Sequence, residues 1–77
     1  MDIREVFARN LRKARNARGL SQEALAYEAG IDRTYISALE REAYSATIVM
    51  VDKLATALDI EPDALLKRPA KRRRRKI

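Results

Sequence analysis

The segment from Arg33 to Arg41 carries side chains that can bind nucleic acid, at helical spacing. One face of the helix predicted there holds the residues spaced three and four apart: Thr34, Ser37, Ala38 and Arg41. An arginine can donate two hydrogen bonds to guanine, a hydroxyl group can bond phosphates or bases, and a methyl group can contact thymine. The segment is therefore a candidate reader of nucleic acid.

Two short helices joined by a turn are predicted to position this segment. The first covers about residues 22–29 after Ser21, and the second about residues 33–41 after Asp32; both preceding residues are good N-caps. Between them, Gly30 can adopt the left-handed conformation that ends a helix. This is the helix-turn-helix layout, in which the second helix enters the DNA major groove.

Composition excludes several other functions. The chain has 77 residues with no cysteine and no histidine, so it offers no thiol nucleophile, histidine base, disulfide or Cys/His zinc site. Its two glycines cannot supply a phosphate-binding loop. We therefore expect no enzyme, cofactor, metal or small-molecule ligand. No apolar run approaches the roughly 20 residues that span a membrane, and the N-terminus lacks the form of a signal peptide. We expect a cytoplasmic protein with no membrane partner.

Basic charge is concentrated at the two ends of the chain. The net charge is +6, from 17 Lys and Arg against 11 Asp and Glu, but eight of the basic residues lie between Lys67 and Lys76. Residues 1–66 alone have a net charge of −2. The distribution therefore matters more than the total. Basic residues crowd the segment from Arg4 to Arg18, which suits one end of the body facing phosphates.

The remaining periodicity predicts an all-α domain over residues 1–68. Five helices are expected, at about 3–17, 22–29, 33–41, 46–58 and 62–67. Ser45 is the expected N-cap of the fourth helix, whose predicted buried face is Ile48, Val51, Leu54, Ala55 and Leu58. Pro62 suits the first turn of the fifth. Residues 69–77 form a basic segment that is predicted to be disordered.

From about residue 6 to residue 66, the chain resembles the Cro/lambda-repressor-like (XRE) helix-turn-helix proteins. The motifs LSQEALA, DRTYIS, LER and ALDIEPDALL occur in the order and spacing of that family. The stretch DRTYIS followed by ER is similar to the controller proteins of restriction–modification systems. The resemblance implies a compact five-helix domain that regulates transcription by binding double-stranded DNA.

Three contacts at the helix starts follow from this resemblance. Gln22 matches a position that contacts the DNA backbone or a base edge, and Arg33 and Thr34 match positions that contact bases. Arg33 is the expected principal reader, since it can bond guanine O6 and N7. The alternatives are an Arg33 that is solvated or paired with Asp32, and a Gln22 that is only a first-turn helix residue.

Contacts along the reading helix and after it are expected from the same resemblance. Ser37 and Ala38 face the DNA, although Ser37 is almost equally well explained as a plain surface residue. Arg41 and Ser45 are assigned to the phosphate backbone. Tyr35 either stacks on the sugar–phosphate backbone or packs against the preceding helix.

The resemblance also implies a structural ion pair between Arg15 and Glu40. This pair would tie the reading helix to the first helix. Two positions depart from the family pattern, because Glu42 stands where glycine is usual and Ala46 where proline is usual. The reading helix either runs further, or a residue other than glycine adopts the left-handed conformation there.

A homodimer is expected, because one module of this size contacts only a few base pairs. The candidate interface residues are late apolar positions: Val49, Met50, Ile60, Leu65 and Leu66. Two other functions compete with a specific regulator. One is a protein-interaction module such as an antitoxin or a coactivator-like adaptor, and the other is a non-specific nucleic-acid binder driven by the basic segment 71–76.

Overall fold

A computed structural model describes residues 2–69 of the chain. These residues form four α-helices and one 3-10 helix, and no strand occurs among them. The elements are α1 (Ile3–Ala17), α2 (Gln22–Ala29), α3 (Arg33–Glu40), α4 (Ile48–Leu58) and η1 (Pro62–Leu65). The all-α architecture agrees with the sequence, whereas the disorder expected of residues 70–77 lies outside the described residues.

Each α-helix begins at a side chain that accepts a hydrogen bond from its first turn. Asp2 accepts from Arg4 N, Ser21 from Ala24 N, Asp32 from Thr34 N and Thr47 from Met50 N. Such a cap satisfies one of the N–H groups that a helix start leaves without a partner, and contributes about 1 kcal/mol. Each helix start is therefore stabilised by a side chain that lies next to it in the sequence.

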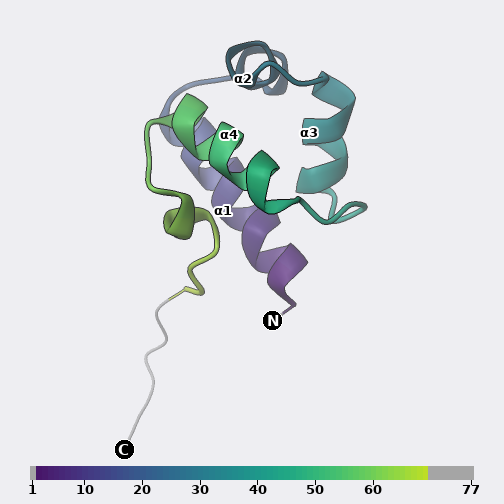
Figure 1. The fold of residues 1–77 in the computed structure, drawn as a ribbon, viewed down its shortest axis with the longest axis vertical. Coiled ribbons are helices and arrows are strands. Elements are labelled where there is room, and N and C mark those ends of the chain that lie inside the picture. Colours follow the sequence, from purple (N-terminus) through teal and green to yellow (C-terminus); the bar gives the residue numbers. More distant parts are fainter. Residues whose placement is uncertain (1, 70–77) are drawn as a thin grey trace, which may run out of the picture.

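One apolar core joins all five elements (Figure 1). α1 packs against α3 and η1, α2 packs against α3 and α4, and α4 also packs against η1. Eight large residues have no more than 1% of their surface exposed: Val6, Leu11, Leu25, Ile36, Leu39, Leu54, Leu58 and Leu65. Burying each contributes about 1.5–3 kcal/mol, so this core is the main stabilising force of a small domain.

The fourth helix starts later than the sequence predicts. Thr47, and not Ser45, is its N-cap, and Ile48 is the first helical residue. Ile48 therefore does not join the buried face and is 88% exposed. Val51 and Leu54, further along α4, are buried in the core instead.

The fifth element is a single 3-10 turn and not an α-helix. Pro62 occupies its first turn, and the chain leaves helical geometry at Leu66. Leu65 is fully buried in the core, so the prediction that it lies in a dimer interface is wrong. The side-chain amide of Asn10 donates hydrogen bonds to the carbonyl oxygens of Leu65 at 3.0 Å and Lys67 at 2.9 Å, which fastens this end of the domain to α1.

Within residues 2–69, none of the helices combines the length and the apolar character that crossing a membrane requires.

Candidate nucleic-acid interface

The turn between α2 and α3 sets the direction of the reading helix. Gly30 ends α2 with φ of 71°, a conformation that L side chains rarely adopt. The N–H of Ile31 then bonds the carbonyl of Ala26 at 3.0 Å, which closes the turn. Asp32 follows in extended conformation and caps α3. The turn is the one that the sequence predicts, and it brings the start of α3 to the surface.

Arg33 and Thr34 stand exposed at this start. The Thr34 hydroxyl donates to Asp32 Oδ1 at 2.8 Å, so it is oriented by the cap. Hydrogen bonds from the Thr34 N–H and hydroxyl lower the pKa of the Asp32 carboxyl, which keeps the cap charged. Among residues 2–69, Arg33 forms no ion pair within 4.0 Å, and this includes Asp32. Its guanidinium is therefore available to a ligand.

Further along α3, the predicted contact residues separate into exposed and covered ones. Ser37 is half-buried and accepts a 3.4 Å hydrogen bond from Nε of exposed Arg41. Ala38 is only 7% exposed, because the loop after α3 folds back on it: the N–H of Ala43 bonds the carbonyl of Ala38 at 2.8 Å. Ala38 lines a surface groove with Ala43 and Tyr44, and its contact with DNA stays a prediction.

The loop after α3 turns at Glu42, which adopts φ of 64° in place of the usual glycine. Of the two outcomes left open by the sequence, α3 therefore ends at Glu40 and a residue other than glycine takes the left-handed conformation. Beyond the turn, the ring of Tyr44 lies 5.7 Å from that of Tyr35, at an interplanar angle of 49°. Tyr35 is half-buried against the core, while Tyr44 and Ser45 are exposed beside it.

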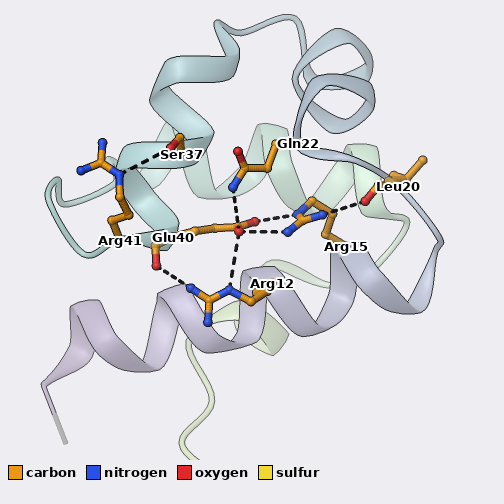
Figure 2. A network of polar contacts seen from close by, with 7 residues as sticks. All are labelled: Arg12, Arg15, Leu20, Gln22, Ser37, Glu40 and Arg41. Carbon is orange, nitrogen blue, oxygen red and sulfur yellow. Dashed lines mark hydrogen bonds and ion pairs between the residues drawn. The ribbon is translucent and has the colours of Figure 1, made fainter.

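The carboxylate of Glu40 lies at the centre of a polar network between three helices (Figure 2). Its side chain is 3% exposed, and its carboxylate accepts hydrogen bonds from Arg15 Nε at 2.7 Å and from Arg15 Nη2 at 3.0 Å. Gln22 Nε2 donates to the same carboxylate at 3.1 Å, and Arg12 Nε lies 3.6 Å away. Arg15 and Arg12 come from α1, Gln22 from α2 and Glu40 from α3. The network therefore fixes the end of the reading helix against both of its neighbours.

Two more hydrogen bonds complete this arrangement. Arg12 Nη2 donates to the backbone carbonyl of Glu40 at 2.7 Å, and this carbonyl is one that the end of α3 leaves without a helical partner. Arg15 Nη1 donates to the carbonyl of Leu20 at 2.8 Å, in the loop before α2. Arg12 was not singled out from the sequence, since a side chain bonding a helix end 28 residues away leaves no local signal.

Burial and charge act in opposite directions on Glu40. Burial raises the pKa of its carboxyl, but the hydrogen bonds from Arg15 and Gln22 and the positive charges of Arg15 and Arg12 outweigh this effect. The net result is a lowered pKa for Glu40. The pKa of Arg15 is raised, mainly because its side chain is hydrogen-bonded to Glu40. Both groups are therefore charged at neutral pH, as a buried pair requires.

Gln22 lies at the start of α2, but its amide nitrogen is bonded to Glu40 in the structure. Its contact with DNA stays a prediction. Of the four candidate interface residues outside the core, Val49 and Leu66 are 67% and 43% exposed, while Met50 and Ile60 are half-buried against the core. In the described part of the chain, no three acidic side chains come together to hold a metal ion.

Comparison with known proteins agrees with this geometry. The HTH_3 helix-turn-helix model matches residues 11–65. Control protein C.SmaI of Serratia marcescens is 44% identical over 68 residues, covering 88% of this chain and 81% of the relative. The crystal structure of a hypothetical transcription factor from Neisseria has 43% identity and a TM-score of 0.86, over 88% of this chain and 78% of that one.

The controller protein C.Esp1396I has been crystallised as a tetramer in complex with its natural 35 base-pair operator. That structure has 29% identity and a TM-score of 0.78, over 84% of this chain and 86% of the other. The segment that the family model matches, residues 11–65, contains every residue of the polar network and the exposed start of α3. The chain therefore belongs to the HTH_3 family of helix-turn-helix proteins and is similar to the controller proteins of restriction–modification systems.

Proposed function

We propose that this protein regulates transcription by binding double-stranded DNA in a sequence-specific manner, with the start of α3 in the major groove. The observation that carries the proposal is the state of Arg33. Its guanidinium is exposed and forms no ion pair among the described residues, at the start of a helix whose other end is held by Glu40. An exposed arginine without an ion-pair partner, on a helix that is anchored at its other end, is suited to read guanine.

The other contacts divide between reading and positioning. Thr34 lies beside Arg33 with its hydroxyl oriented by Asp32, so its oxygen can accept from a base or its methyl can contact one. Arg41, Ser37 and Ser45 are assigned to phosphates, which set the register of the protein on the duplex without reading sequence. Tyr35, whose ring lies 5.7 Å from that of Tyr44, is assigned to the sugar–phosphate backbone.

We further propose that the protein binds its operator as a homodimer. Ile48 and Val49 are adjacent and 88% and 67% exposed, and Leu66 is 43% exposed. Burying such side chains against a second copy is favourable, and two reading helices one DNA turn apart, about 34–36 Å, would extend the site. The C.Esp1396I–operator complex, in which a relative is a tetramer on its DNA, supports assembly of this kind.

The test is selection of binding sites from random duplex DNA by the full chain and by Arg33→Ala. The full chain is expected to enrich a two-fold site with half-sites about one turn apart. Arg33→Ala is expected to lose about 1–3 kcal/mol of discrimination at one base pair of each half-site, with an unchanged thermal melt.

Lys53→Gln is the matched control for loss of one positive charge. Lys53 is exposed on α4 and lines a hollow with Glu28 and Asp52, so this variant should select the wild-type site. Failure of the full chain to enrich any sequence would contradict specific binding. If Arg33→Ala enriched the same sequence as the wild type, Arg33 would not be a residue that reads the bases.

A further inference from the structure

A cationic surface, separate from the start of α3, lies on the outer side of α1, which is the side that faces away from α3. Arg15 points from α1 toward α3, since it bonds Glu40. Lys13 precedes Arg15 by two residues, which is about 200° around a helix, so it points away from α3. Arg9 lies one turn before Lys13 on the same side, and both are exposed.

The end of the domain brings more positive charge to this side. Asn10 bonds the carbonyl oxygens of Leu65 and Lys67, which holds the segment after η1 against α1. Figure 1 shows η1 and this segment on the side of the molecule away from α3. Lys67 and Arg68 thus lie next to Lys13, and the three line one hollow.

Two adjoining hollows on this side are lined, within residues 2–69, by basic and uncharged residues. One is lined by Asn10, Lys13, Ala14, Ala17, Ile60, Ala64, Lys67, Arg68 and Pro69, and the adjoining one by Arg9, Asn10, Arg12, Lys13 and Pro69. No carboxylate lines either hollow within residues 2–69. Arg9, Lys13 and Lys67 also form no ion pair with any described residue. The next residues in the chain, 71–76, are all Lys or Arg.

This concentration of charge is unusual for the domain that carries it, because residues 1–69, which include Lys67 and Arg68, have a net charge of zero. Arg9, Lys13 and Lys67 have no ion-pair partner among the described residues, so their positive charges repel one another, and a polyanion relieves that repulsion. Phosphates along a nucleic-acid strand are regularly spaced, and neutralising them releases condensed counterions. A phosphodiester backbone therefore matches the chemistry of this surface.

We infer that the outer side of α1, through Arg9, Lys13 and Lys67, is a second DNA-binding surface that takes the phosphate backbone of duplex DNA without sequence preference. It is separate from the start of α3. The inference rests on the proposed function, and it adds a surface that raises affinity for all duplexes alike.

The experiment measures binding of the full chain to a labelled duplex of random sequence between about 50 and 200 mM salt. Lys13→Gln is expected to reduce the magnitude of the slope of log affinity against log salt by about 0.9, and Arg9→Gln/Lys13→Gln by about 1.8. Lys53→Gln, which removes the same charge from α4, is expected to leave the slope unchanged. Thermal melts of all three should match the wild type, because these side chains are exposed.

Two results would overturn the inference. One is an equal slope for Lys13→Gln and Lys53→Gln, and the other is an unchanged slope for Arg9→Gln/Lys13→Gln. Failure of the proposed function looks different, since selection would then enrich no site while the slope measurement could still be made. Lys13→Gln should weaken binding of random DNA, whereas Arg33→Ala should weaken only the selected site.

Discussion

Glu40→Ala is expected to lower the free energy of unfolding by about 3–5 kcal/mol, because it leaves Arg15 with a buried and unpaired charge. The side chain of Arg15 is 13% exposed, and two of its three hydrogen bonds go to the Glu40 carboxylate. The contact from Arg12 to the Glu40 carbonyl remains in the variant, since it uses the backbone. The loss is therefore specific to the carboxylate and its bonds to Arg15 and Gln22.

Urea unfolding followed by helical circular dichroism at neutral pH measures this loss. A small domain has a stability near the lower end of the usual 5–15 kcal/mol, so Glu40→Ala should be partly unfolded without denaturant. For a domain of this length, each kcal/mol also lowers Tm by about 4–8 °C. Glu28→Ala is the matched control: Glu28 is exposed on α2, and its loss should change stability by no more than about 0.5 kcal/mol.

A double variant tests whether the charge, and not the volume, is responsible. Arg15→Met/Glu40→Leu removes both charges and keeps apolar bulk, so it should recover much of the stability that Glu40→Ala loses. Equal stability of Glu40→Ala and Glu28→Ala would refute the reasoning, as would a double variant less stable than Glu40→Ala. Glu40→Ala should lose DNA binding through unfolding, in contrast to Arg33→Ala, which stays folded.

Three further outcomes are expected. The lowered pKa of Glu40 stabilises the folded protein at pH values above the pKa of the unfolded state, near 4.5, and this stabilisation is lost as the pH falls through the pKa of the folded state. Urea unfolding at decreasing pH should show this loss for the wild type and not for Glu40→Gln. Thr47→Ala should cost about 1 kcal/mol in the same assay, because it removes the cap of α4, whereas Ser45→Ala should cost less than about 0.5 kcal/mol. Glu42→Gly should raise Tm, since a β-carbon in the left-handed conformation costs about 1–2 kcal/mol and the entropy of glycine offsets only part of the gain. An unchanged or lower Tm would show that the loop holds Glu42 without strain.

The elements whose limits are set by neighbouring residues are predictable from sequence. Ser21, Gly30 and Asp32 act within one turn of their own positions, so the bounds of α2 and the start of α3 follow from local rules. The apolar periodicity of α1 and α4 likewise identifies Leu11 and Leu54 as core residues. Local chemistry and helical repeat are visible in the order of residues alone.

Features that depend on how the chain folds back were not predictable in this way. Ser45 and Thr47 are both acceptable caps, and their residue types do not show which of them α4 starts from. Ala38 is covered by a loop whose course the sequence does not show, and Leu65 is buried because the 3-10 turn packs against α1 and α4. In the candidate site, the exposed start of α3 follows from the motif, whereas the part that Arg12 plays at its end does not.

The bonds around Glu40 mean that α2 and α3 cannot be moved to another protein as an independent cassette. A graft of residues 21–41 would carry Gln22 and Glu40 but leave Arg12 and Arg15 behind. The host would then have to bury a carboxylate without its cations, and the reading helix would lose the anchor that sets its angle. Exchange of DNA specificity between such domains is therefore better made by changing the exposed residues at the start of α3 than by transplanting the two helices.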